Sequence, residues 1–370
     1  MFTMANCHIP NSSGFDKYQM NDYEYIRQQV QDAASSQTAL AIQGGGSKQF
    51  YGRTTQGETL AVGQYSGIFD YTPSELVISA RAGTPLAELE NRLDEQGQML
   101  PFEPPHFGDH ATLGGTIACG LSGPRRPWAG AARDFVLGVN CINGSGEYLR
   151  FGGQVMKNVA GYDLSRTLTG SLGTLAVLLD VHLKVLPRPE TSTTLRQSCS
   201  ATEALQRINE WSGKPLPLSG GCYMDGSLYV RLSGTNRGVQ AAADTLGGDI
   251  LDSSETFWED LREHRLDFFA GDTPLWRLSV PPASAVLELD GDWLIDWGGA
   301  QRWLRTELPA STIRTAVATI GGHASLFNGG DRNGDVFQPL TPALLALHQR
   351  IKHTFDPAGI LNPGRMYPAL

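Results

Sequence analysis

The sequence predicts an α+β protein of two domains, and three observations support this fold class. The chain has 370 residues, more than one ordinary hydrophobic core holds, because domains average about 150 residues. Its N-terminal part alternates a helix pattern, short apolar strands and glycine-rich turns. Residues 187–192 (PRPETS), rich in proline and hydroxyl groups, separate this part from a stretch in which amphipathic helices and a hairpin replace the glycine-rich segments. We therefore expect a large domain followed by a smaller one.

The large domain is expected to begin with a helix over residues 22–34 and to continue mainly in strands. The first strand runs directly into Gly44-Gly45-Gly46-Ser47. After residue 81 the apolar segments are short and separated by glycines, which is typical of a mostly antiparallel sheet. The predicted strands are residues 38–43, 59–62, 76–82, 135–142, 148–151 and 175–186.

The smaller domain shows the pattern of a strand–helix–hairpin–helix cap. Apolar residues at 204, 205, 208 and 211 share one helical face, and an Asp225-Gly226 turn precedes an alternating strand. A second helix is expected near residues 238–246, and a last one over 341–355, before the turn-rich phrase FDPAGILNPGRMY. The predicted organisation is a disordered N-terminus (1–20), a first domain (21–189), a cap (190–335) and a C-terminal segment (336–370) that packs back on the first domain.

Composition excludes several classes of protein. The net charge is −9 and no basic run is interleaved with aromatics, so nucleic acid is not an expected partner. We find no signal peptide and no stretch of the ~20 apolar residues that a membrane span needs, which predicts a cytoplasmic protein. The cysteines are odd in number and widely spaced, which argues against disulfides, a zinc site and an iron–sulfur ligand set. We expect inert thiols at Cys7, Cys119, Cys141, Cys199 and Cys222.

The 43 glycines far exceed the ~7% of average usage, and glycine at that density indicates a backbone that approaches something closely. The first glycine segment, IQGGGSK at residues 42–48, matches neither a Rossmann fingerprint nor a Walker loop in spacing. It can still form a nest whose N–H groups converge on a pyrophosphate, assisted by Ser47 and Lys48. An ordinary glycine turn is the alternative.

Two further segments repeat the theme. In residues 103–134, five glycines remove Cβ atoms where a flat ring or a phosphate would collide with them. Arg125, Arg126 and Arg133 bring cations that could face phosphates, although Arg125 or Arg126 alone could equally be solvated. In residues 157–178, the run from Gly170 to Thr174 leads into an apolar strand, a geometry in which backbone amides can meet the edge of a ring.

The order of these motifs resembles the FAD-binding domain of the vanillyl-alcohol-oxidase (PCMH) type. The motifs are GGGSK, a GGTIACG loop with a downstream Arg-Asp, GYDL with GSLGTL, and FDPAGILNPG. Within that superfamily, PPHFG, GLSGPRRPW, RFGGQVMKNVAGYDLSR, LWRLSVP, LIDWGGAQRWL and LNPGRMY resemble the FAD-binding E subunits of bacterial glycolate oxidases along nearly the whole chain. The resemblance implies a PCMH-type domain of two α/β subdomains with a smaller α+β cap.

The resemblance also implies roles for individual residues. The pyrophosphate turn is matched by Gly44, Gly45, Gly46, Ser47 and Lys48, and the strand end beside FAD by Gly83 and Thr84. The second phosphate and ribityl loop is matched by Thr112, Gly114 and Gly115, with Arg133 and Asp134 downstream. Segments against the flavin or adenine contain Asp163, Gly173, Thr174 and Val177, and Asn362 lies in the phrase that closes over the isoalloxazine.

Two departures from the family pattern have consequences. Many relatives carry a histidine in the first glycine turn that bonds covalently to the flavin, and glycine stands there in this chain, which predicts non-covalent FAD. The segment that reads GSEGTLG in catalytic D-2-hydroxy-acid dehydrogenases has Leu172 in place of the acid and Ala176 in place of the last glycine. Their histidine-rich metal site is not recognisable in this chain either.

Several polar and aromatic residues are weighed for function. His106 and His110 have the spacing of helical zinc ligands, but the surrounding prolines and glycine argue against a helix, and no metal is expected. His323 could exchange a proton with a 2-hydroxy acid, or be a core histidine. Arg277 alternates with apolar neighbours and could clamp a carboxylate, or pair structurally with Asp296. Core or interface positions are expected for Trp276, Trp293, Trp297 and Trp303.

These observations leave two hypotheses. In the first, the chain is an enzyme subunit whose FAD takes part in oxidising glycolate, with Arg277 and His323 as catalytic residues. The resemblance then implies a second FAD-bearing catalytic subunit and an iron–sulfur subunit as partners, in a complex that could place this chain at the inner face of the membrane. In the second, the chain is a non-catalytic FAD-binding relay or assembly subunit, and a partner flavoprotein performs the chemistry.

Overall fold

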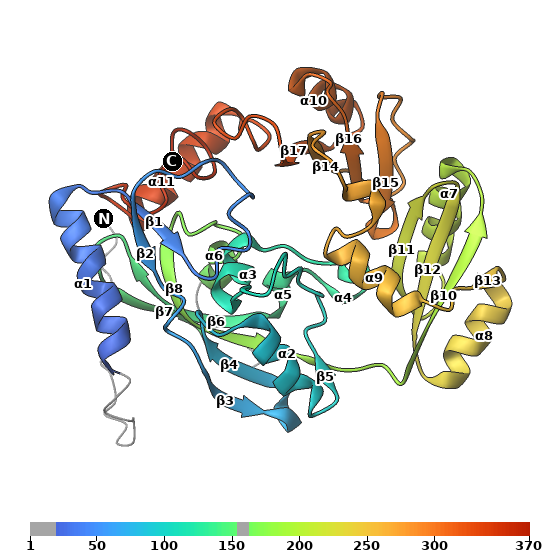
Figure 1. The fold of residues 1–370 in the computed structure, drawn as a ribbon, viewed down its shortest axis with the longest axis horizontal. Helices are drawn as coiled ribbons and strands as arrows, with labels where there is room; N and C mark the ends of the chain where they lie inside the picture. The colour runs from blue at the N-terminus through green and yellow to red at the C-terminus, as the bar shows by residue number, and fades with distance from the viewer. Residues whose placement is uncertain (1–19, 154–162) are drawn as a thin grey trace.

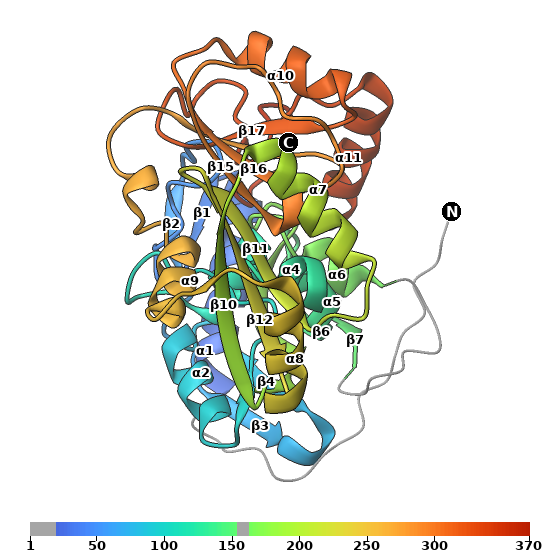
Figure 2. The same cartoon turned by 90° about the vertical axis from the view of Figure 1, so that its right-hand side faces the viewer.

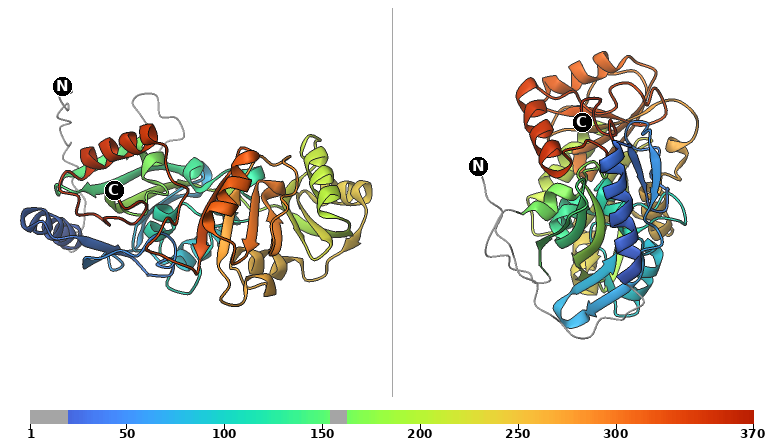
Figure 3. Two further views of the ribbon diagram at one scale, coloured as in Figure 1. Left: turned by 90° about the horizontal axis from the view of Figure 1, so that it is seen from above. Right: turned by 90° about the vertical axis from the view of Figure 1, so that its left-hand side faces the viewer.

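The computed structural model describes residues 20–153 and 163–370, arranged as two bodies side by side along the long axis of the molecule (Figures 1 and 3). The disorder expected for the N-terminus, and the first part of the KNVAGYDL segment, lie outside the described residues. None of the described helices is long and apolar enough to cross a bilayer.

The N-terminal domain is built on a five-stranded antiparallel sheet in the order β3-β4-β8-β6-β7. One face packs against α2 (Leu86–Asp94) and α3 (Leu113–Cys119), and the other against α1 (Met20–Ser36). A parallel pair, β1 (Leu40–Gln43) and β2 (Glu58–Ala61), lies beside α1. The strands of the sheet are β3 (Ile68–Thr72), β4 (Val77–Arg81), β6 (Val136–Asn143), β7 (Tyr148–Gly152) and β8 (Ala176–Lys184).

The cap is a single eight-stranded sheet in the order β13-β10-β12-β11-β15-β16-β14-β17. The expected strand–helix–hairpin–helix unit accounts only for its first half, where α7 (Ala201–Ser212) and α8 (Asn236–Leu246) pack on the strands (Figure 2). The second half extends the same sheet and adds α9 (Ser254–Arg262) and α10 (Ala310–Thr319). The strands are β10 (Thr191–Ser198), β11 (Leu218–Met224), β12 (Ser227–Gly234), β13 (Asp249–Ile250), β14 (Leu275–Ser279), β15 (Asp292–Asp296), β16 (Gln301–Arg305) and β17 (His323–Asn328).

Local sequence signals explain several element ends. Asp225 and Gly226 both have positive φ (48° and 71°), as the two-residue turn between β11 and β12 requires. Ser200 and Glu203 form a capping box that starts α7. Thr112 caps α3 by accepting a hydrogen bond from the N–H of Gly115.

The C-terminal segment returns to the start of the fold. After α11 (Pro342–Phe355), Leu361 forms a parallel bridge with Leu40 of β1. The amide of Leu40 donates to the carbonyl of Ile360 at 2.7 Å, and that of Asn362 donates to the carbonyl of Leu40 at 2.9 Å. The buried Lys352 fixes this return, since its Nζ donates to the carbonyls of Thr174 and Leu361. Residues more than 300 positions apart therefore share one small sheet.

The cap and the N-terminal domain touch through residues 103–126. The carboxylate of Glu263, at the end of α9, accepts the backbone N–H groups of His106 and Phe107 at 2.9–3.1 Å. Trp297 of the cap donates its indole N–H to the carbonyl of Gly123 at 3.0 Å, and Arg126 lies 4.3 Å over the Trp297 ring. These contacts hold the two bodies together beside the cavities described next.

Candidate FAD site

A cavity of about 440 Å³ lies where the end of β1, β2, α3 and the C-terminal segment meet. We call it the glycine cavity, because Gly44, Gly45 and Gly46 form one wall and Gly114, Gly115 and Gly173 contribute to others. Apolar side chains from β1 and β8, including Ile42 and Leu178, line the rest together with polar groups. The three glycine segments that the sequence singles out thus meet around one space.

The turn after β1 presents backbone N–H groups to this cavity. Within the part of the chain that the structure describes, the N–H groups of residues 44–48 donate no hydrogen bond to another protein group. Gly46 has a φ of 77°, so the turn uses a conformation that favours glycine. Successive unpaired amides of this kind form an anion-binding nest.

The charge of the cavity also suits an anion. Among the residues that the structure describes, three cations line it, Lys48, Arg332 and Arg365, and no aspartate or glutamate does. Lys48 is buried and donates to the carbonyl of His106 at 3.0 Å. Burial lowers the pKa of Lys48. Burial together with the neighbouring Arg365 lowers the pKa of Arg332 to about 10, so Arg332 remains protonated at pH 7. A diphosphate would find counter-charges here.

Sequence reasoning missed Arg332 and Arg365. Both stand in turn-rich segments, GGDRNGD and LNPGRMY, that give no helical or strand periodicity. Arg365 could have been predicted from the motif LNPGRMY, because the same motif contains Asn362, which the family resemblance assigns to the cofactor. For Arg125 and Arg126 the sequence left open a phosphate contact or a solvated position. Both instead contact residues where the cap meets the N-terminal domain, Arg125 with Glu103 and Arg126 with Trp297.

Several of these glycines are required by the protein's own packing. A Cβ on Gly45 would stand 1.4 Å from the carbonyl oxygen of His110, and one on Gly44 would stand 2.6 Å from Thr112 Oγ1. A Cβ on Gly114 would stand 2.7 Å from the Cβ of Ala82. A collision with a ring or a phosphate is therefore not the main reason why glycine is required. Glycine is required because other segments of the chain pack directly against these positions in the cavity wall.

Asn362 ties three walls of the cavity together. Its Oδ1 accepts the N–H of Ile42 at 2.8 Å, and its Nδ2 donates to the carbonyl of Leu172 at 2.7 Å. A Cβ on Gly173 would stand 2.7 Å from that same Nδ2. Asn362 lines the cavity as expected, but its amide is engaged by the protein and acts as a clamp.

Four of the expected residues lie behind the cavity wall. Thr84 is buried and accepts the N–H of Gly67, and Gly83 lies against the carbonyls of Gly63 and Tyr65. The hydroxyl of Thr174 donates to the carbonyl of Ser171. The side chain of Val177 packs in the core with α1, while its neighbours Ala176 and Leu178 face the cavity.

Three further expected residues stand elsewhere. Asp134 accepts the N–H of Ala131, and Asp163 caps the short helix α6 (Leu164–Leu168). Arg166 lies 2.8 Å from Asp163 and 3.7 Å from Asp134 in an exposed cluster. Arg133 is exposed beside them. The structure does not bring Arg133, Asp134 or Asp163 to the cavity. Local hydrogen bonds and the ion pairs with Arg166 hold Asp134 and Asp163 at the surface.

The residues of the glycine cavity fit FAD. The nest and three cations suit a diphosphate, the apolar walls suit flat rings, and the threonines offer partners for hydroxyl groups. No histidine is among the lining residues, although the free thiol of Cys119 is. The site is built to hold a long anionic ligand with two aromatic ends.

A second cavity, of about 220 Å³, brings Arg277 and His323 together. They stand on neighbouring strands, with Arg277 opposite Ser325 and His323 opposite Ser279. Arg277 Nη2 donates to the hydroxyl of Tyr51 at 3.2 Å. His323 is exposed at the start of β17. Partial burial first, and then the charge of Arg277, lower its pKa below 6.5, so the neutral imidazole predominates at pH 7 and is able to accept a proton. Leu172 lines both cavities, which makes them neighbours.

The alternative ion pair between Arg277 and Asp296 is not formed in the described structure. Asp296 instead accepts the N–H of Trp297 at 2.7 Å and approaches Gln301 at 3.4 Å. Burial raises the pKa of Asp296 to about 7. Arg277 therefore keeps guanidinium N–H groups for a ligand. Among the described residues no acidic side chain lines the 220 Å³ cavity, although Arg277 and Asp296 both line a small space of about 20 Å³.

The two histidines with metal-ligand spacing make unrelated contacts. His106 Nε2 lies 2.8 Å from a carboxylate oxygen of Glu90, and the carbonyl of His110 lies against Gly45. Among residues 20–153 and 163–370, no three His, Cys, Asp or Glu side chains gather as a metal site would require. The four described cysteines are free thiols.

Comparisons with known proteins agree with this geometry. Residues 18–152 match the family model of the FAD binding domain, and residues 333–366 match that of the C-terminal domain of FAD linked oxidases. FAD is thus confirmed as the cofactor that the fold accommodates. A solved structure of alkyldihydroxyacetonephosphate synthase shares the fold, with a TM-score of 0.63, 16% identity and coverage of 92% of this chain and 75% of that one.

Curated relatives place the chain more closely. It is 31% identical over 142 residues to the glycolate oxidase subunit GlcD of Bacillus subtilis, and the aligned residues cover 38% of this chain and 30% of that protein. It is 50% identical over 350 residues to the glycolate oxidase subunit GlcE of Escherichia coli, which covers 94% of this chain and 99% of that protein. The chain therefore belongs to the family of the glycolate oxidase subunit GlcE.

Proposed function

We propose that this chain is the FAD-binding subunit of a glycolate oxidase and takes part in oxidising glycolate to glyoxylate. The observation that carries the proposal is the glycine cavity, with five unpaired amides, three cations and no acid in its walls. Family membership supplies the reaction class. Bound FAD supplies a two-electron acceptor beside the second cavity.

We propose roles for two residues of that second cavity. Arg277 binds and orients the carboxylate of the 2-hydroxy acid through its free guanidinium N–H groups. The neutral His323 accepts the proton of the substrate hydroxyl. Arg277 is held in place by its hydrogen bond to the hydroxyl of Tyr51 and by two aromatic rings. Its guanidinium carbon lies 5.7 Å from the ring centroid of Tyr51 and 6.0 Å from that of Phe327.

We further propose that electrons leave this chain to partner subunits. Among the described residues no cysteine cluster offers iron–sulfur ligands, and the relatives are subunits by name. An iron–sulfur subunit and a second FAD-bearing subunit are the partners that the sequence resemblance implies. The cytoplasmic location, the domain limits at 189 and 335, and non-covalent FAD remain predictions.

Reconstitution tests the cofactor proposal. The purified chain should take up one FAD, and acid should release it unmodified, which also tests whether Cys119 bonds to it. Protein that shows no flavin absorbance after reconstitution would overturn the proposal.

Anaerobic titration tests the reaction. Glycolate added to the isolated flavoprotein should bleach its flavin. Arg277→Gln should raise KM about tenfold or more, because one charge-assisted hydrogen bond to a carboxylate contributes roughly 1.5–3 kcal/mol. His323→Gln should lower kcat about a hundredfold and change the pH profile. Complexes that turn over glycolate at an unchanged rate with both variants would exclude these two residues and leave FAD binding standing.

A further inference from the structure

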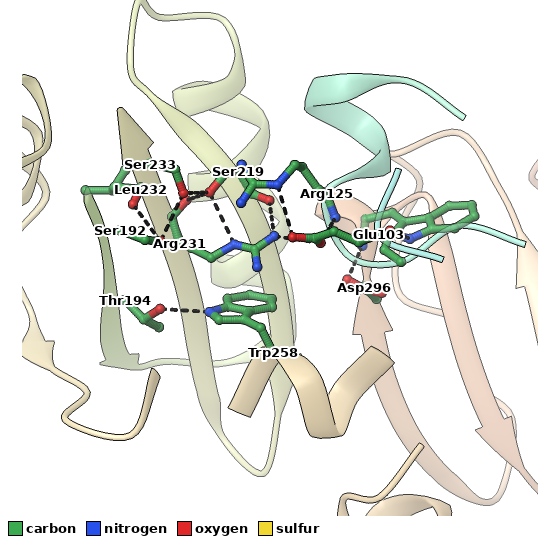
Figure 4. Close-up of polar contacts among 12 residues, drawn as sticks. Glu103, Arg125, Ser192, Thr194, Ser219, Arg231, Leu232, Ser233, Trp258 and Asp296 are labelled. Atoms are coloured by element: carbon green, nitrogen blue, oxygen red, sulfur yellow. Dashed lines mark hydrogen bonds and ion pairs between the residues drawn. The ribbon is translucent and has the colours of Figure 1, made fainter. Parts of the chain in front are cut away.

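A buried ion cluster joins the two domains next to an unassigned cavity (Figure 4). The carboxylate of Glu103 lies between two arginines. Glu103 and Arg125 belong to the N-terminal domain, and Arg231 belongs to the cap. Its Oε1 accepts Arg125 Nε at 3.0 Å, and its Oε2 accepts Arg231 Nη2 at 2.9 Å. Burial opposes ionisation of Glu103, but the two guanidinium groups outweigh it and lower its pKa, so Glu103 is a carboxylate.

The cluster holds one positive charge more than its own carboxylate neutralises. The side chain of Arg231 is 9% exposed and that of Arg125 12% exposed, so both guanidinium groups are largely removed from water. Arg231 is fixed by Ser219, whose hydroxyl and carbonyl accept its Nε and Nη2, and it lies 4.8 Å over the ring of Trp258. Buried charges of this kind need a partner.

Three nitrogens of the cluster have hydrogen atoms to give. Arg231 Nη1 and both terminal nitrogens of Arg125 donate no hydrogen bond within the described structure. In Figure 4 one terminal nitrogen of Arg231 carries no dashed line. Both arginines line a cavity of about 490 Å³ between the domains, which we call the interdomain cavity.

The walls of the interdomain cavity restrict what it can take. Met99, Leu100 and Trp258 give it apolar surface beside the arginines. Four glutamates besides Glu103 also line it and would repel a second negative charge: Glu90, Glu190, Glu255 and Glu259. Arg188 and Arg262 stand in the same walls. It shares no lining residue with the glycine cavity or with the cavity of Arg277 and His323.

We propose that the interdomain cavity is a binding site for a small monocarboxylate. One carboxylate bound by Arg125 and Arg231 neutralises the excess charge and uses their free N–H groups. Dianions bind more weakly because of the four glutamates in the cavity wall. The ligand bridges the domains, since Arg125 belongs to one and Arg231 to the other, and so fastens the cap to the N-terminal domain. The site is independent of the proposed oxidation.

Calorimetry on the FAD-loaded full chain tests this site, with acetate and malonate as probes in a low-salt buffer. All proteins carry Arg277→Gln, which removes carboxylate binding at the proposed substrate cavity. We expect one acetate per chain, with malonate about fivefold weaker or more because of repulsion by the glutamates. Arg125→Gln should weaken acetate about tenfold or more, whereas the exposed Arg237→Gln should leave it unchanged.

A second variant protects the test against misfolding. Met99→Trp adds bulk to the cavity wall, keeps all three residues of the ion cluster and should also abolish acetate binding. Absence of acetate binding in the Arg277→Gln protein would overturn the proposal, as would equal acetate affinity in it and in the Arg125→Gln and Met99→Trp variants. Flavin absorbance is measured on every sample, so that failure of this site and failure of FAD binding are distinguished.

Discussion

Replacing Gly45 by alanine should disable FAD binding. The new Cβ would stand 1.4 Å from the carbonyl oxygen of His110, whereas real Cβ contacts stay above 3.0 Å, so the two backbones must separate by about 1.6 Å. A shift of that size takes nest amides outside the 2.7–3.2 Å range of a hydrogen bond. Losing two bonds to a phosphate at roughly 1.5–3 kcal/mol each weakens FAD by about 3–6 kcal/mol, or two to four orders of magnitude in Kd.

The assay is titration of the apoprotein with FAD, followed by quenching of flavin fluorescence. Gly138→Ala serves as the matched control, because its Cβ would also clash with backbone, at 2.7–2.9 Å from Gly153 and Phe151, but in β6 and away from the cavity. The control should lower the melting temperature and leave the Kd for FAD within about threefold. If Gly45→Ala binds FAD as tightly as the control does, the nest does not hold the diphosphate.

Two further perturbations concern buried charges. The pKa of Asp296 is raised from 3.8 to about 7, so the folded state binds a proton that the unfolded state releases. Its stabilising contribution is therefore complete below pH 3.8 and is lost as the pH rises to about 7. Asp296→Asn should remove up to about 4 kcal/mol of this pH dependence of the unfolding free energy, at 1.36 kcal/mol per pKa unit. Denaturant unfolding of both proteins at pH 4, 6 and 8 measures the effect. If the unfolding free energies of the two proteins change in parallel with pH, the raised pKa of Asp296 is contradicted. Lys352→Met leaves the buried Asp356 without its cation and should destabilise the fold by about 3–5 kcal/mol. The double variant with Asp356→Asn should recover part of this loss in thermal unfolding, and no recovery would show that the ion pair is not the cause.

The sequence predicted those parts of the fold that depend on neighbours along the chain. Apolar periodicity located the helix Met20–Ser36 and the strands β4 and β6 within a few residues, because burial of one face leaves a local pattern. Alternation also assigned Arg277 to the face opposite Trp276 and Leu278, and these two pack in the cap core. The extent of the cap sheet could not be predicted in this way, because the order of strands depends on pairing between distant segments.

In the candidate site, too, the features set by local sequence were predicted and those set by contacts between distant segments were not. Glycine spacing identified the residue 44–48 turn, but the reason for glycine at 44, 45 and 114 is contact with residues 110, 112 and 82, which no spacing reveals. Arg332 and Arg365 enter the cavity from loops whose path is set by tertiary contacts, such as the hydrogen bonds of Arg332 to the carbonyl of Gly52. Arg125 looked like a phosphate ligand because a sequence cannot show that Glu103, 22 positions earlier, takes its charge.

The bridge between Leu40 and Leu361 constrains how the protein is made. During synthesis β1 leaves the ribosome some 320 residues before the strand partner that completes its pairing. Until then Ile42 lacks the amide oxygen of Asn362, and the wall at residues 172–173 lacks its tie. The wall of the glycine cavity is therefore complete only after residues 361 and 362 have been synthesised and have returned to β1.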